Sequence, residues 1–227
     1  MLRVGLCCGL ILNLTENLNN SLEFTKKLFS DFGRLIILII IHLIPLANWI
    51  VVGYGARVLR ESPGSDSPPK LEKYGELFVD GAKIVVASLI YMIIPLILIV
   101  VGFGGVIAST DMTRGALLMG GTGLVLTLIG FILIFVLLIL LAAGIAHMVK
   151  TGKFSKAFAF SEILGVIRKI GWGKYIVWII LVWIIYMILG AVFTLPIIGW
   201  LIAVVLGPAL SVYFARSLGI LYAEGTS

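Results

Sequence analysis

Few residues in this 227-residue sequence have side chains that could carry chemistry, and His42 is the most conspicuous of them. It lies deep inside an apolar stretch, three residues before Pro45. An ionisable group inside a membrane segment is by default a functional candidate, here a proton-sensitive or substrate-contacting group. A neutral imidazole that bonds to Asn48, or to carbonyls freed by the proline, is the interpretation we favour. His42 and Asn48 are therefore a candidate intramembrane polar site.

Two arginines stand at matched places of an internal repeat, because Ala56-Arg57-Val58-Leu59 resembles Ala215-Arg216-Ser217-Leu218. Each arginine would lie near the cytoplasmic end of a membrane hairpin, where it could bind an anion or a phospholipid headgroup. Simple extension of each side chain to the membrane interface is the alternative that we favour. Arg57 and Arg216 remain candidate lipid or anion contacts.

Motifs of known membrane enzymes are missing from the sequence: it has no HExxH, no pair of membrane aspartates and no phosphate-binding GxxxxGK[ST]. Neither histidine has a carboxylate at helical spacing to orient its ring for a metal, and His147 beside Lys150 suits a helix end that favours cations. Cys7 and Cys8 are adjacent, which gives neither a disulfide framework nor a metal-site spacing. We expect no catalytic residues, no metal and no cofactor, and hence no enzyme.

The composition places most of the chain in lipid. Hydrophobic residues make up 61% and charged residues 12% of it, whereas soluble proteins are about half apolar and about a quarter charged. Crossing a membrane takes about 20 helical residues, and Pro196 can end one helix and begin the next. The charge-poor stretches predict transmembrane helices at 83–108, 116–148, 174–194 and 196–221.

The distribution of charge orients these helices. The connector between the second and third contains one acid, Glu162, against Lys150, Lys153, Lys156, Arg168, Lys169 and Lys174. Because Lys and Arg are retained in the cytoplasm, this connector should be cytoplasmic. We expect a multi-pass protein of the cell membrane.

The first apolar stretch, 34–59, is predicted to be a short hairpin. The segment Pro45-Leu46-Ala47-Asn48-Trp49-Ile50 resembles Pro196-Ile197-Ile198-Gly199-Trp200-Leu201, so this stretch looks like a shortened copy of the last hairpin. Its arms would reach only about 18 Å, less than the roughly 30 Å hydrocarbon core. We expect a re-entrant hairpin, with both chain termini in the cytoplasm. One kinked span, with the N-terminus outside, is the alternative.

Amphipathic segments precede the membrane elements. Segments 21–34, 71–83 and 154–170 place apolar residues three and four apart among charges, which is typical of helices lying at the membrane interface. Prolines and turn-forming residues between Glu61 and Lys70 predict a linker that is too short to be a domain. The expected fold is all-α and polytopic, with an N-terminal extension at 1–20 and a single membrane domain at 21–224.

Small residues recur every fourth position along the last predicted helix. This spacing lets another helix approach closely, which is how membrane helices gain packing energy in lipid. We expect the partner helix to lie within the chain, with self-association as the alternative. The stripe consists of Gly199, Ala203, Gly207, Ser211, Ala215 and Gly219.

Three motifs carry a family resemblance: Gly53-Tyr54-Gly55-Ala56-Arg57-Val58-Leu59-Arg60, Glu76-Leu77-Phe78-Val79-Asp80-Gly81 and Gly152-Lys153-Phe154-Ser155-Lys156-Ala157-Phe158. Through them the chain resembles the prokaryotic, largely archaeal, membrane family known as domain of unknown function 4013. The resemblance covers about residues 21–224. It implies a multi-pass membrane protein and transfers no catalytic residues.

A structural or scaffolding role in the membrane is the function that the sequence favours, with a basic cytoplasmic face that contacts anionic lipid or a partner. We expect membrane lipids as partners, with self-association or another membrane protein as further candidates, and no nucleic acid. A small transporter or channel is the first alternative, because broken helices often build substrate sites. A lipid-modifying enzyme ranks last.

Overall fold

The computed structural model describes residues 2–108 and 114–226, and the side chains of 13–107 and 120–226. Within these ranges the chain is almost entirely helical and contains no strand, which confirms the all-α prediction. The elements in chain order are α1 (Leu2–Ser30), α2 (Phe32–Leu43), α3 (Asn48–Glu61), α4 (Tyr74–Ala108), α5 (Arg114–Thr151), the 3-10 helix η1 (Phe154–Phe158), α6 (Phe160–Ile170), α7 (Trp172–Phe193) and α8 (Ile198–Glu224).

Four of the described segments are long and apolar enough to cross a membrane: Tyr74–Ile107, Gly120–Thr151, Trp172–Phe193 and Ile198–Glu224. Helices α7 and α8, with 22 and 27 residues, extend about 33 and 40 Å, enough for a core of about 30 Å. Many large apolar side chains on these segments are exposed, as lipid-facing residues are. The protein is a membrane-embedded, multi-pass helical protein.

Two amphipathic segments have different boundaries from those expected. Helix α4 begins at Tyr74, so most of segment 71–83 is the start of that long helix rather than a separate interfacial helix. Helix α1 runs without a break from Leu2 to Ser30, so the expected extension and the first amphipathic segment share one helix. Only segment 154–170 forms short helices of its own, η1 and α6.

The chain divides into two compact units, Met1–Val85 with Ala143–Ser227 (unit 1) and Val86–Ala142 (unit 2). Unit 2 is a hairpin made by the later part of α4 and most of α5. The two helices of this hairpin approach each other closely. A Cβ atom on Gly102 would lie 2.6 Å from the Gly123 carbonyl oxygen, and a Cβ atom on Gly130 would lie 3.1 Å from the Pro95 carbonyl oxygen. Small residues therefore allow the two backbones of unit 2 to touch.

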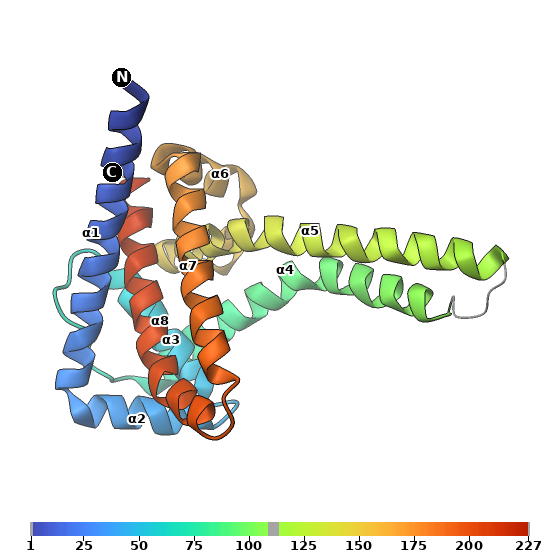
Figure 1. The fold of residues 1–227 in the computed structure, drawn as a ribbon. Helices are drawn as coiled ribbons and strands as arrows, with labels where there is room; N and C mark the ends of the chain where they lie inside the picture. Colours follow the sequence, from blue (N-terminus) through green and yellow to red (C-terminus); the bar gives the residue numbers. More distant parts are fainter. Residues whose placement is uncertain (1, 109–113, 227) are drawn as a thin grey trace. The chain divides into compact units, whose positions relative to one another are not determined.

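Unit 1 is assembled around α8. Helix α1 runs antiparallel to it: Asn17 bonds to Ser217, whereas Phe29, later in α1, lies near Leu206, earlier in α8. Consequently α1 begins and α8 ends at the same end of this unit (Figure 1). Helix α3 runs parallel to α8, because Gly55 faces Ser211 and Leu59 faces Gly219.

The first apolar stretch is broken at residues 44–47, around Pro45, into α2 and α3. These helices have 12 and 14 residues, about 18 and 21 Å, so neither crosses a membrane alone. Figure 1 shows α2 crossing the direction of α8 instead of running along it. The break thus occurs where the sequence predicts it, but the two arms are not a scaled copy of the α7–α8 pair.

The apolar core of unit 1 joins five helices, of which α1 to α4 follow one another in the chain and α8 is distant in sequence. Its buried members are Phe24, Leu28, Leu35, Leu38, Val51, Tyr54, Val58, Leu77 and Val212. Next to it, α3 and the start of α4 cross in backbone contact, because a side chain on Gly53 would overlap the Leu77 carbonyl and one on Gly81 the Trp49 carbonyl. Both glycines belong to the motifs that carry the family resemblance.

Candidate functional site

Polar contacts in unit 1 gather along the last three turns of α8, which we call the polar end of α8 (Arg216, Ser217, Tyr222 and Glu224). Each of these residues binds a side chain from another helix. Ser217 Oγ accepts from Trp178 Nε1 at 2.8 Å and donates to Asn17 Oδ1 at 2.8 Å. Glu224 forms an ion pair with Lys174. The polar end of α8 therefore holds α1 and α7 in place.

Arg216 is 3% exposed although it carries a charge. Its Nε donates to Asn20 Oδ1 at 3.0 Å and its Nη1 to the Ser65 carbonyl at 2.8 Å. Its guanidinium carbon lies 4.6 Å from the centre of the Phe24 ring, a cation–π geometry. The free-energy cost of burying this charge is offset because the guanidinium N–H groups have hydrogen-bond acceptors and the guanidinium plane lies over the Phe24 ring.

Residues 62–73, which we call the linker, contain no helix, and side chains from several helices bind their carbonyl groups. A proline-rich segment cannot satisfy its own backbone acceptors, so these donors replace helical hydrogen bonds. The contacts run from Lys150 to Ser62, Arg216 to Ser65, Lys27 to Asp66, Arg34 to Pro68, Tyr54 to Pro69, and Arg57 to Lys70 and Glu72.

Arg57 and Arg216, the candidate lipid or anion contacts, thus bind the same linker from α3 and α8. Arg57 Nη1 donates to the Glu72 carbonyl at 2.9 Å, and its other terminal nitrogen lies 3.9 Å from the Glu76 carboxylate. The structure gives both arginines partners within the chain. At matched positions of the repeat, both arginines donate hydrogen bonds to linker carbonyls, Arg216 near its beginning and Arg57 near its end.

A second polar cluster surrounds His147, which is 8% exposed. Its Nδ1 lies 2.6 Å from the Tyr222 hydroxyl and its Nε2 lies 2.8 Å from Glu162 Oε2. The other oxygen of Glu162 accepts from Lys156 Nζ at 2.5 Å. Hydrogen bonds from Lys156 and then from His147 lower the pKa of Glu162, so this carboxylate stays ionised and ties η1 and α6 to α5.

The candidate intramembrane polar site consists of one hydrogen bond. His42 Nδ1 lies 2.7 Å from Asn48 Oδ1, across the break between α2 and α3. On the other side of the ring, a Cβ atom on Gly207 would lie 2.5 Å from His42 Nε2, so the imidazole is packed against α8. His42 therefore connects α2 to α3 through Asn48 and packs against α8 at Gly207.

The stripe of small residues on α8 faces neighbours within the chain. Gly207 faces α2, Ser211 and Ala215 face Gly55 of α3, and Gly219 faces Ser62, 2.5 Å from where its Cβ would lie. Gly199 faces the Phe193 carbonyl in the turn from α7, and Ala203 is half-buried. Small residues of the stripe thus let four different segments, α2, α3, the linker and the end of α7, pack closely against α8.

A polar cleft of about 370 Å³ lies beside Arg216, between α1, the linker and α8. Three amides and one carboxylate from α1 form much of its wall. Its lining residues are Asn13, Glu16, Asn17, Asn20, Pro63, Asp66, Arg216, Ile220 and Glu224.

The sequence did not reveal the His147 cluster or the role of α1. His147 and Tyr222 are 75 positions apart, and Asn17 and Ser217 are 200 apart, so no local spacing joins them. The polar residues of α1 were a usable signal, since Asn17 and Ser21 lie four apart and are both buried against α8.

Comparison with known proteins identifies the family. The model of the family described as "Protein of unknown function (DUF4013)" matches residues 35–204, well over half of the chain, and the chain belongs to this family. The match is shorter than the resemblance over 21–224 that the motifs suggested, and α1 and the polar end of α8 lie outside it. No curated protein and no solved structure matches the chain.

Proposed function

We propose that this DUF4013 protein is a non-enzymatic structural protein of the cell membrane, whose cytoplasmic face binds anionic lipid. The observation that carries the proposal is the outer face of α6. One side of this helix is buried in unit 1 through Ile163, Val166, Ile167 and Ile170. The opposite side presents apolar and cationic residues together, which is the composition of a helix that lies in a membrane interface.

Exposed side chains define this outer face of α6. Phe160 and Leu164 are 45% and 40% exposed, and Trp172, just beyond the helix, is 43% exposed. Arg168 and Lys169 are also exposed, and neither forms an ion pair with a described residue. Tryptophan and basic residues favour the headgroup region, and each cation near an anionic surface contributes about 1 kcal/mol.

Two glycines set the ends of this segment. Gly152, with φ of 72°, separates α5 from η1, and Gly171, with φ of 95°, separates α6 from α7. Residues with a Cβ atom rarely adopt these conformations, so glycine lets the chain turn sharply on both sides of η1 and α6. The Glu162–His147 contact then holds α6 against α5. Its outer face is thereby kept in one orientation.

Lipid-dependent stability tests this function. The full chain, in nanodiscs of phosphatidylcholine with or without phosphatidylglycerol, should melt at a higher temperature when phosphatidylglycerol is present. Arg168→Glu should remove most of that difference, because reversing one cation costs about 2 kcal/mol of attraction. Lys70→Glu is the control, since it makes the same charge reversal at an exposed position of the linker, outside the outer face of α6. Equal melting of the wild-type protein in both lipids, or equal losses in both variants, would contradict the proposal.

The broken hairpin does not make a transporter the better candidate. Substrate sites at broken helices rely on unwound backbone and helix ends that are free to bind a substrate or ion. Here the break is bridged by the His42–Asn48 hydrogen bond and packed on Gly207. These contacts favour a structural role for the break.

A further inference from the structure

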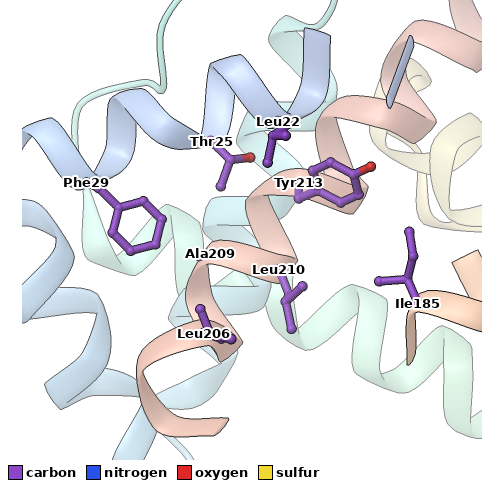
Figure 2. Close-up of a pocket in the computed structure, with 8 residues that line it drawn as sticks. All are labelled: Leu22, Thr25, Phe29, Ile185, Leu206, Ala209, Leu210 and Tyr213. Carbon is purple, nitrogen blue, oxygen red and sulfur yellow. The ribbon is translucent and has the colours of Figure 1, made fainter. Parts of the chain in front are cut away.

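An apolar groove of about 300 Å³ lies in unit 1 between α1, α7 and α8. Figure 2 shows Leu22, Thr25 and Phe29 of α1 on one side, Leu210 and Tyr213 of α8 below, and Ile185 of α7 across the opening. The lining is almost entirely hydrocarbon. The hydroxyl of Thr25 already donates a hydrogen bond to the Ser21 carbonyl at 2.7 Å, so its proton is not available to a ligand in the groove.

The groove is continuous with surface that faces the bilayer. Ile185 and Leu210 belong to helices long and apolar enough to cross a membrane. Ile188, one turn beyond Ile185, is 61% exposed, and the rim residues Leu22 and Phe29 are 46% and 43% exposed. Apolar surface of this kind is covered by whatever surrounds it, and around a membrane helix that is lipid hydrocarbon.

A pair of opposite charges, Lys26 and Glu23, lies on α1 next to the rim residues, although neither residue lines the groove. Lys26 follows Leu22 by four residues and precedes Phe29 by three, so it shares their face of α1. Its ammonium lies 2.7 Å from Glu23, and both side chains are mainly exposed, at 60% and 67%. Such a pair complements a zwitterion: the lysine suits a phosphate, and the glutamate suits an ammonium group.

We propose that this groove binds one hydrocarbon chain of a phosphatidylethanolamine-like lipid, with the zwitterionic headgroup at Lys26 and Glu23. A volume of about 300 Å³ is at the small end of ligand pockets, which suits one chain and excludes a folded headgroup. This site shares no residue with the outer face of α6, so it stands whether or not α6 binds anionic lipid.

Photolabelling tests the site directly. The full chain is reconstituted in phosphatidylglycerol vesicles, which lack a zwitterionic headgroup, with a little phosphatidylethanolamine that carries a diazirine on one chain. The sample is then irradiated and mapped by mass spectrometry. Adducts should concentrate on segments 22–29 and 206–213, and unlabelled phosphatidylethanolamine should compete them away more effectively than phosphatidylglycerol does. Adducts spread evenly over the exposed faces of α7 and α8, or equal competition by the two lipids, would overturn the proposal.

Filling the groove provides the matched variant. Leu210→Trp should lower adduct formation in these segments about tenfold, because the indole takes the space of the lipid chain. Leu201→Trp is the control, since Leu201 is 52% exposed on the same helix and does not line the groove. If Leu210→Trp fails to fold, lipid competition with the wild-type protein still decides. Disulfide cross-linking of two chains through Phe29→Cys would show a second copy in the groove and overturn the lipid assignment.

Discussion

Arg216 shows how a charged side chain can be structural inside an apolar bundle. Its donors bind Asn20 and the Ser65 carbonyl, and its face lies on Phe24. Hydrogen bonds from a charged donor contribute about 1.5–3 kcal/mol each, and a buried acceptor left alone costs about 1–3 kcal/mol. Arg57, at the matched repeat position, makes similar bonds in a more exposed setting.

We expect these two arginines to differ in their effect on stability. Arg216→Met should lower the free energy of unfolding by about 2–3 kcal/mol, since it leaves Asn20 and the Ser65 carbonyl without their donor. Arg57→Met, the matched control, should cost about 1 kcal/mol, because water can replace its bonds. Thermal unfolding in detergent measures both. Equal losses would show that burial of Arg216 has no special role.

At the scale of helices, glycines decide where backbones touch. In unit 1, Gly53 and Gly81 bring α3 against the first turns of α4, and each faces a backbone carbonyl of the other helix. A carbonyl on a helix cannot move aside as a flexible side chain could, so any Cβ atom there forces the helices apart. The crossing is reinforced nearby by the Arg60–Asp80 ion pair at 2.7 Å.

Gly81→Ala should therefore destabilise unit 1 by about 1–3 kcal/mol, the cost of overpacking a close contact. Gly75→Ala provides the control on the same helix, because a Cβ atom at Gly75 meets nothing within 4 Å. That substitution should be neutral or slightly stabilising, since alanine favours helix over glycine. Melting curves of the two variants decide. If Gly81→Ala melts like Gly75→Ala, the α3–α4 crossing is looser than the structure shows.

At the scale of the whole molecule, sequence reasoning succeeded where a property is local. Apolar length identified the four spanning helices, and Pro45 and Pro196 marked the two breaks that the structure places at 44–47 and 194–197. It failed where contacts are distant. The sequence predicted a short linker between Glu61 and Lys70 but not its partners, and residues from five helices bind it. Helix α4 also continues back to Tyr74 through a segment whose charges pair with α3.

The candidate site was only partly visible from the sequence, for the same reason. Arg216 was singled out through the repeat, but its partners Asn20 and Phe24 lie nearly 200 positions away. His147 was interpreted from its neighbour Lys150, whereas the structure pairs it with Glu162 and Tyr222. Local spacing can show that a polar residue is unusual, but tertiary packing determines which group it binds.

We propose that polar groups of unit 1 collect on one face, the cytoplasmic one, with apolar helices crossing the membrane beyond it. Single cysteines at exposed positions test this most directly, in a background where Cys7 and Cys8 are serine. Asn13, Lys153 and Leu195 are suitable, since they lie on α1, before α6 and in the α7–α8 turn.

A membrane-impermeant thiol reagent applied to sealed cells, and then to inverted membrane vesicles, is the deciding measurement. We expect Asn13→Cys and Lys153→Cys to react only in the inverted vesicles, and Leu195→Cys to react only in sealed cells. Labelling of Asn13→Cys and Lys153→Cys from opposite faces would contradict this arrangement, because α1 and α6 could not then share a cytoplasmic face.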